Sequence, residues 1–161
     1  MKIACIGGGP ASLYFALLAK KRLPSAEIDV YEQNKPDDTF GWGVVFSDET
    51  LGKFGDADAE SYAEIRRNFA YWTDIDTFYG GAKTVSTGHG FCGLARVKLL
   101  QILHDRCIQV GVRVHYQHPI EDIDGLKKTH DLVVAADGVN SKVRDRFAAS
   151  FQPDLDWRKC K

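Results

Sequence analysis

The residues best suited to chemistry are the glycine-rich segment from Gly7 to Ser12 and the acid Glu32, which follows Ser12 by twenty residues. GGGPAS fits the pattern G-x-G-x-x-[G/A/S], typical of a strand-to-helix turn that holds a dinucleotide pyrophosphate. Gly7 allows the tight turn, and Gly9 lets phosphates approach backbone N–H groups at the helix start. Glu32 is placed to accept hydrogen bonds from ribose hydroxyls and disfavours a 2′-phosphate. The pattern therefore predicts binding of FAD or NAD rather than NADP.

Three small residues, Pro10, Ala11 and Ser12, complete the predicted cofactor-binding turn. Pro10 suits the first position of a helix, where its missing N–H is not needed and its φ is already set. Ser12 stands where a third glycine is usual and is small enough to keep helix and strand close. The alternative is a glycine-rich turn without a ligand, followed by a solvated carboxylate at Glu32.

A second motif, Asp137-Gly138, closes the apolar run 132–136 in the segment DLVVAADGVNSKVR. The continuous apolar run is typical of a parallel strand covered on both faces. The Asp-Gly pair, with Ser141 and Arg144 after it, is either a cofactor-related motif or an ordinary turn that ends a strand.

An α/β framework is needed to position these motifs, and the apolar periodicity predicts one. The first unit reads strand, glycine turn, helix, strand, which is a βαβ crossover. Gly80-Gly81 indicates a hairpin, and 33–55 is expected to be a long ordered loop. The expected strands are 2–6, 28–31, 71–79, 82–87, 112–116 and 132–136, and the expected helices are 11–19, 58–69 and a third that contains 99–110 and ends at Gly111.

Composition restricts the class of protein. The 161 residues are 44% apolar and 27% charged with a net charge of −1, as in a globular α/β domain, and this argues against disorder and against nucleic acid or membrane partners. The six-residue apolar run at the N-terminus is too short for a signal peptide or a membrane span. The scattered Cys5, Cys92, Cys107 and Cys160 favour neither disulfides nor zinc, so a cytoplasmic location is expected.

Taken together, the motifs resemble the single-component FAD-dependent aromatic hydroxylases, the group of para-hydroxybenzoate hydroxylase. GGGPAS, GWGVVFSD (41–48), HGFCG (89–93) and AADGVNSKVR (135–144) are most similar in order and spacing to one subgroup. That subgroup contains salicylyl-CoA 5-hydroxylase and 2-aminobenzoyl-CoA monooxygenase/reductase, with the indole hydroxylases of violacein synthesis as cousins. The resemblance implies a Rossmann-like FAD-binding domain with a parallel sheet and a small inserted antiparallel hairpin.

The resemblance also implies roles for particular residues. Gly43 and Val44 would lie beside the isoalloxazine, Arg96 would contact the FAD phosphate or ribose region, and Asp137 with Gly138 would support the FAD site. A guanidinium suits phosphate because it binds oxygens in pairs. Many relatives carry an arginine where Gly41 stands here, so the gating role of that arginine does not transfer. The alternative for Arg96 is an ordinary arginine on a helix surface. The alternative for the loop is that Trp42 and Phe46 anchor it in the core.

By the same resemblance, the cofactors are FAD and a transient NADH or NADPH. The substrate is a small aromatic or aryl-CoA compound, which the enzyme hydroxylates with the use of O₂. The chain is expected to be an incomplete domain: 1–70 a first FAD-binding segment, 71–93 a hairpin of a substrate-side sheet, and 94–161 a second, truncated segment. We expect 157–161 to begin a further strand. We also expect the 161 residues alone to bind FAD weakly or not at all, without turnover. The motifs nominate no catalytic acid, base or nucleophile.

Other functions compete with this interpretation. The chain could be a non-catalytic dinucleotide-binding module or a relic, an indole or tryptophan-type hydroxylase, or an NAD-dependent reductase, against which Asp137-Gly138 and GWGVVFSD argue. A metal site at His115, His118 and His130 is disfavoured because no cysteine or carboxylate stands at ligand spacing. The acid pairs Asp37-Asp38 and Asp122/Asp124 favour turns rather than catalysis.

Overall fold

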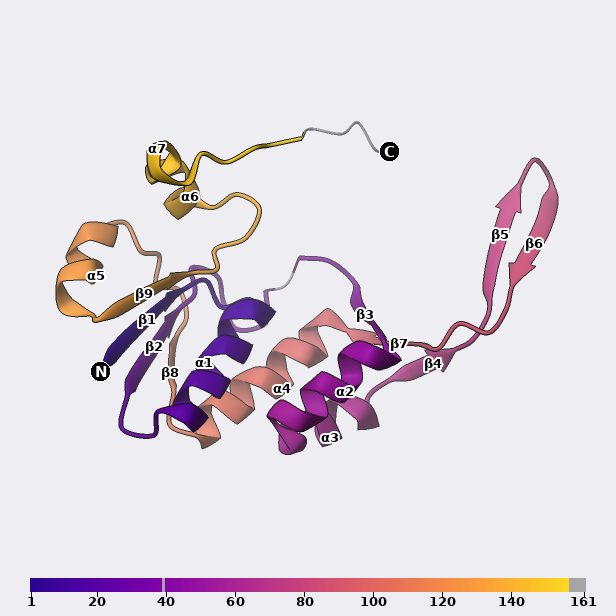
Figure 1. Ribbon diagram of the computed structural model, residues 1–161, viewed down its shortest axis with the longest axis horizontal. Coiled ribbons are helices and arrows are strands. Elements are labelled where there is room, and N and C mark those ends of the chain that lie inside the picture. Colours follow the sequence, from indigo (N-terminus) through magenta and orange to yellow (C-terminus); the bar gives the residue numbers. More distant parts are fainter. Residues whose placement is uncertain (39, 157–161) are drawn as a thin grey trace.

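The computed structural model describes residues 1–38 and 40–156. Its largest sheet in these residues is parallel and has four strands. Its strands are ordered β8-β2-β1-β9, so the N-terminal strand lies in the interior of the sheet (Figure 1). The strands are β1 (Lys2–Ile6), β2 (Glu27–Tyr31), β8 (Arg113–His115) and β9 (Leu132–Ala135). All four strands were predicted from the sequence, and the mixed α/β class with a parallel sheet is confirmed.

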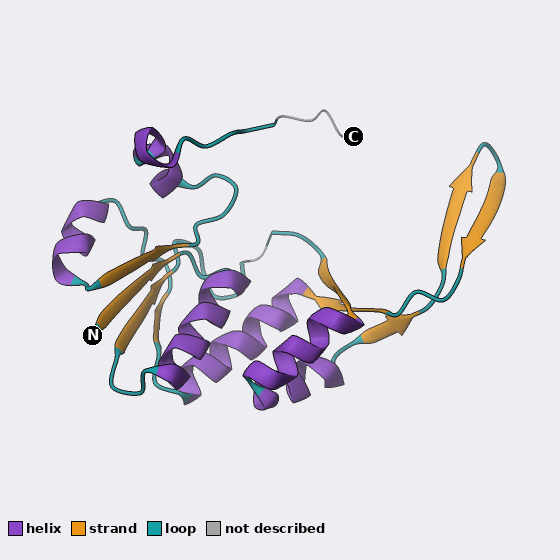
Figure 2. Ribbon diagram, viewed as in Figure 1, coloured by secondary structure: helices purple, strands orange, loops and turns teal. Residues whose placement is uncertain are grey.

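Two long helices cover one face of this sheet. Helix α1 (Pro10–Arg22) buries Leu13, Ala16 and Leu17 and packs against α4 (Arg96–Gln109), as Figure 2 shows. Three short helices follow: α5 (Ile123–Thr129), α6 (Lys142–Arg146) and α7 (Ala148–Phe151). None of the helices in the described ranges combines the length and the apolar character that crossing a bilayer requires.

A second sheet is antiparallel, with strand order β3-β7-β4. It consists of β3 (Gly43–Ser47), β7 (Phe91–Ala95) and β4 (Ala70–Trp72), and the helices α2 (Asp48–Ala57) and α3 (Ala59–Arg67) connect β3 to β4. Phe46, Cys92 and Leu94 bury one face of the sheet in the main core. The prediction of a long ordered loop over 33–55 is therefore wrong from residue 43 onward, because β3 pairs along its length with β7, far away in the sequence, and α2 follows β3 directly.

A hairpin of β5 (Ile75–Tyr79) and β6 (Ala82–Ser86) projects away from both sheets (Figure 2). The turn predicted at Gly80-Gly81 is confirmed. The expected single strand 71–79 is instead two strands in different sheets, since the chain leaves β4 at Thr73 and Asp74 before β5 begins. Every residue of the two hairpin strands is exposed.

Strand β9 is less buried than its apolar sequence predicts, and this corrects a second expectation. Leu132 is 39% exposed, and Val133 and Val134 are only half-buried. The apolar run was expected to be covered on both faces. Within the described residues it is hydrogen-bonded on one side alone, to β1.

A buried carboxylate joins three helices. Asp58, 1% exposed, caps α3 by accepting from the Ser61 N–H, and it also binds Lys21 of α1 at 2.5 Å and Arg106 of α4 at 3.0 and 3.2 Å. Burial by itself would raise the pKa of the Asp58 carboxyl. The hydrogen bonds from Arg106, Lys21 and Ser61 outweigh burial and hold this pKa well below its usual range.

A second carboxylate, Asp29 of β2, binds the neighbouring edge strand. Its oxygens accept from Arg113 at 2.7 Å each and from His115 Nε2 at 2.7 Å. The Arg113 hydrogen bonds lower the pKa of Asp29 from 3.8 to about 2, against the opposing effect of burial, and His115 adds to the lowering. The ionised carboxylate therefore ties β2 to β8.

We expect the Asp29 interactions to stabilise the fold by roughly 2 kcal/mol at neutral pH. Because the folded pKa is the lower one, this stability is present above about pH 4 and is lost as the pH falls toward 2. Urea unfolding of wild type and Asp29→Asn from pH 7 to pH 2 should show a gap that closes in this window. The exposed Asp74→Asn is the control and should follow wild type, whereas a constant gap for Asp29→Asn would contradict the assignment.

Candidate functional site

The turn between β1 and α1 has the geometry of a phosphate-binding loop. Gly7 has φ +99°, and a Cβ on it would lie 2.4 Å from the Ala136 carbonyl oxygen, so this position requires glycine. Gly9 is the N-cap of α1 and faces open space. No side chain caps the helix in the described structure, so the first backbone N–H groups of α1 point at that space. An anion fits there.

Glu32 lies beside this turn, at the end of β2. Its Oε2 accepts from the Gly8 N–H at 2.6 Å, and its Oε1 accepts from the N–H and the side-chain amide of Asn34 at 2.8 and 2.7 Å. A carboxylate oxygen can accept two hydrogen bonds, so Oε2 keeps one lone pair for a ligand hydroxyl. Asn34 was not predicted from the sequence. It lies two residues after Glu32, a spacing at which the backbone N–H and the side-chain amide of one residue can hydrogen-bond the side chain of the other.

Arg96, distant in sequence, lines the same small hollow. It is the first residue of α4, its backbone N–H donates to the Trp42 carbonyl at 3.2 Å, and its Nε is buried without a hydrogen-bond partner among the described residues. The hollow has a volume of about 70 Å³. Its lining consists of Gly8, Gly9, Glu32, Asn34, Lys35, Pro36, Asp38, Phe40, Arg96, Leu100 and Tyr116. The guanidinium, the helix start and the carboxylate are thus brought to one place.

The remaining residues of the predicted turn lie on α1. Pro10 is the first residue of the helix, as expected, and Ala11 is exposed. Ser12 is fully buried between α1 and the sheet, which agrees with its predicted packing role.

The GWGVVFSD segment forms β3 rather than a loop. Gly43 is exposed, while Val44 is half-buried and packs against the core. Phe46 is a core residue, as the alternative interpretation had it, but Trp42 is 98% exposed and anchors nothing in the described structure.

The Asp137-Gly138 motif follows β9 and supports a helix start. Asp137 accepts from the Ser141 hydroxyl at 2.6 Å and from the Val143 N–H at 3.3 Å, while Ser141 itself caps α6. Ala136, just before the motif, is the residue that Gly7 approaches. The structure therefore brings the Asp-Gly segment to the back of the glycine turn, and not into the hollow that Glu32 and Arg96 share.

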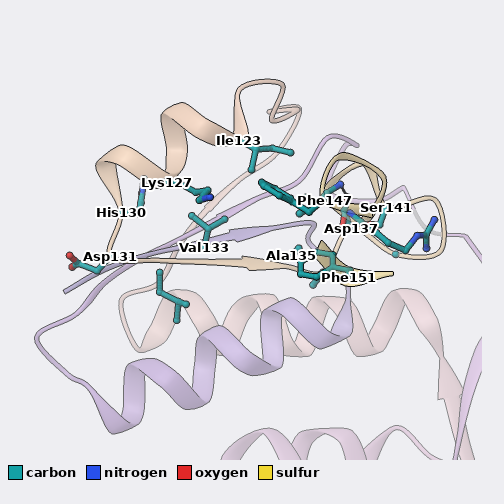
Figure 3. A pocket seen from close by; sticks show the side chains of 15 residues that line it. Ile123, Lys127, His130, Asp131, Val133, Ala135, Asp137, Ser141, Phe147 and Phe151 are labelled. Atoms are coloured by element: carbon teal, nitrogen blue, oxygen red, sulfur yellow. Dashed lines mark hydrogen bonds between the residues drawn. The ribbon is translucent and has the colours of Figure 1, made fainter. Parts of the chain in front are cut away.

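A larger groove of about 820 Å³ runs along the free edge of β9. Figure 3 shows Ile123 and Lys127 of α5, Val133 of β9 and Phe147 around it, with Asp137 and Ser141 at one end. Its walls are mainly apolar, and the Lys127 ammonium lies 5.0 Å from the centre of the Phe147 ring. It is separate from the hollow beside the glycine turn.

His115 and three of the cysteines have structural surroundings. His115 binds Asp29, and across 1–38 and 40–156 no group of three or more His, Cys, Asp or Glu side chains is arranged to hold a metal ion. Cys5, Cys92 and Cys107 lie in the core, and burial raises the pKa of Cys5 to about 11 and of Cys107 to about 12. Cys160 and the segment 157–161 lie outside the described residues.

The parallel sheet, the glycine turn at a helix start and an acid after the second strand define a Rossmann-like fold, the kind of fold in which dinucleotides bind. No protein-family model matches the chain. It is 40% identical over all 161 residues to a salicyloyl-CoA 5-hydroxylase of Streptomyces, covering 31% of that protein. It is also 33% identical over 151 residues to the 3-hydroxy-4-methyl-anthranilyl-[aryl-carrier protein] 5-monooxygenase of Streptosporangium sibiricum, covering 94% of this chain and 42% of that one. The chain thus spans less than half the length of these relatives.

Solved structures agree with this fold. The tetrameric form of 2-methyl-3-hydroxypyridine-5-carboxylic acid oxygenase matches with a TM-score of 0.75 at 22% identity, over 89% of this chain and 41% of that one. A putative FAD-containing monooxygenase of Photorhabdus luminescens matches with a TM-score of 0.67 at 19% identity, over 93% of this chain and 43% of that one. The resemblance inferred from the motifs is confirmed by the two relatives: the chain matches a part of the Streptomyces hydroxylase over all 161 residues and a part of the Streptosporangium monooxygenase over 151 residues.

Proposed function

We propose that this chain is the FAD-binding part of a flavoprotein monooxygenase that hydroxylates an aromatic substrate. The observation that carries the proposal is that Glu32 and Arg96 meet the glycine turn in one hollow. Two relatives, which match 100% and 94% of this chain, are a hydroxylase and a monooxygenase, and this supports the reaction type. A nicotinamide reductant, NADH or NADPH, and a cytoplasmic location are part of the same proposal.

The side chains present fit FAD. The N–H groups at the start of α1 and the Arg96 guanidinium would hold the pyrophosphate, and the spare lone pair of Glu32 would accept from a ribose hydroxyl. The buried, unpartnered Nε of Arg96 is itself an argument for a ligand, since buried N–H groups normally find an acceptor. Bound FAD supplies the redox and oxygen-transfer chemistry, while these residues position it.

The substrate class that we propose is an aryl thioester. One relative is named for salicyloyl-CoA and the other for an anthranilyl group on an aryl-carrier protein. In both, a benzoyl ring with a hydroxyl or amino substituent is carried as a thioester. The ring is electron-rich, as hydroxylation requires.

The test measures binding without turnover, through the rise in melting temperature that a ligand causes. We expect FAD at 1 mM (on the order of ten times a weak Kd) to stabilise the protein by about 1.4 kcal/mol, and FMN by much less because it lacks the adenosine ribose and second phosphate. Arg96→Met should weaken FAD binding about tenfold, since it removes a charged donor.

Glu32→Ala should narrow the preference for FAD over FMN, because it removes the acceptor for the ribose hydroxyl. Arg67→Met is the matched control: it removes an exposed arginine of α3 that binds Glu64 and should leave FAD binding unchanged. The proposal fails if FAD and FMN stabilise the protein equally, if neither does, or if Arg67→Met and Arg96→Met behave alike.

A further inference from the structure

The outward face of the β3-β7-β4 sheet is open and lined by small and aromatic residues. Val44, Phe46, Cys92 and Leu94 point into the core, so the alternating residues of β3 and β7 point outward. On β7 these are Phe91, Gly93 and Ala95, and on β3 they are Gly43, Val45 and Ser47. Val45 is 58% exposed. Such a face accommodates a flat apolar ring.

Trp72 of β4 adds an aromatic surface to this face. A Cβ on Gly93 would lie 3.1 Å from Trp72 Cη2, so the indole lies across the glycine. The Trp72 and Phe91 rings are 6.0 Å apart between centroids. The absence of a side chain at Gly93 is therefore what lets the indole approach β7 this closely.

His89, the first residue of the HGFCG segment, lies at the end of this aromatic row. Its ring stacks on Phe91 with centroids 5.5 Å apart, and its Nε2 hydrogen-bonds the Ser86 hydroxyl at 2.6 Å. Its backbone N–H donates to the Thr73 carbonyl at 2.8 Å. The ring is only half-buried, and no described residue hydrogen-bonds Nδ1. The histidine is thus held by three contacts, and its Nδ1 is left without a hydrogen-bond partner among the described residues.

The outward face is continuous with the candidate cofactor site. Arg96, which lines the hollow with Glu32, directly follows Ala95 at the other end of β7. At about 3.3 Å per residue, the strand runs roughly 13 Å from Ala95 to Phe91, with His89 two residues beyond. A ligand at His89 would therefore lie along the same strand that leads from the cofactor hollow.

We propose that the outward face binds the aryl group of the substrate against Trp72 and Phe91, and that His89 Nδ1 hydrogen-bonds a hydroxyl or amino substituent of the ring. This rests on the proposed function. It makes His89 a residue that selects substituted aryl thioesters over unsubstituted ones. A site that hydrogen-bonds a substrate hydroxyl rejects analogues that lack it, because its own polar group is left unpaired.

Calorimetric titration with salicyloyl-CoA, benzoyl-CoA and CoA, with and without FAD, tests the proposal. Wild type should bind salicyloyl-CoA about tenfold more tightly than benzoyl-CoA. His89→Phe keeps a ring for the stack on Phe91 and should remove this preference, leaving the affinity for benzoyl-CoA within about twofold. His89→Asn, which can still hydrogen-bond, should restore part of the preference.

His118→Phe is the matched control, an exposed histidine outside this face, and should keep the full preference. Melting curves of each variant show that the fold is retained. The proposal is overturned if wild type binds both thioesters equally or binds neither, if the preference survives in His89→Phe, or if CoA alone binds as tightly as salicyloyl-CoA. FAD stabilisation, measured separately, shows whether the cofactor assignment still holds in those cases.

Discussion

Replacing Gly7 by alanine is expected to destabilise the fold by about 2–5 kcal/mol and to abolish stabilisation by FAD. The backbone at Gly7 has φ +99°, where a Cβ is strained, and the added atom would lie 2.4 Å from the carbonyl oxygen of Ala136. That oxygen belongs to the backbone after β9 and cannot rotate away. To relieve the overlap, the glycine turn must separate from the end of β9, which also moves the phosphate-binding N–H groups.

Urea unfolding followed by circular dichroism measures the loss, with Gly52→Ala as control. Gly52 is in helix α2, and a Cβ there meets nothing within 4 Å. Because glycine is a poor helix former, Gly52→Ala should stabilise the protein by up to about 1 kcal/mol. A Gly7→Ala protein as stable as wild type would show that the close approach to Ala136 is not required.

The second large effect is expected for Asp58→Asn, with a loss of about 2–4 kcal/mol at neutral pH. Asparagine keeps the size of the side chain and can still accept from the Ser61 N–H. It removes the charge opposite Lys21 and Arg106, whose side chains are 37% and 14% exposed, and leaves the Arg106 cation poorly paired. The charged contacts that join α1, α3 and α4 through Asp58 are lost.

The pH dependence separates charge from packing at Asp58. Since its folded pKa is lowered, the ionised form stabilises the protein above the unfolded value near 3.9, and this stability is lost as the pH falls through the folded pKa. The gap between wild type and Asp58→Asn should therefore be full at pH 7 and shrink below about pH 4. Glu60→Gln, 70% exposed and bound to the same Arg106, should change stability by less than about 0.5 kcal/mol. A gap of the same size at pH 2 as at pH 7 would indicate packing instead.

The parallel part of the fold could be predicted from sequence because its signals are local. Apolar runs mark β1 and β9, and β2 and β8 were also predicted as strands. The proline and basic residues at the two ends of α1 mark its limits, within a few residues of the structure. The hairpin turn at Gly80-Gly81 has a local signal as well.

The antiparallel sheet could not be predicted, because nonlocal contacts form it. β3 is five residues long, begins with a glycine and is stabilised by pairing with β7. Helix α2 contains two glycines, yet Phe54 stacks on Tyr14 at 4.5 Å and Leu51 is buried. Tertiary packing thus overrides the low helix propensity of the segment.

The candidate site divides in the same way. Gly7, Gly9 and Glu32 follow from spacing along one βαβ unit. The position of Arg96 beside them follows from α4 packing on α1, which no local pattern shows. The hydrogen bonds of Asn34 to Glu32 and of His89 to Ser86 depend on side-chain orientations, which residue spacing alone does not predict.

The interior position of β1 has a consequence for folding during synthesis. β1 leaves the ribosome before the other described strands, yet one of its two hydrogen-bonded neighbours, β9, is translated roughly 130 residues later, a delay of about 6–26 s at 5–20 residues per second. Until then the apolar β1–β2 pair has a bare edge, which other nascent chains can join. This edge of β1 is therefore covered only after residue 135 has emerged from the exit tunnel.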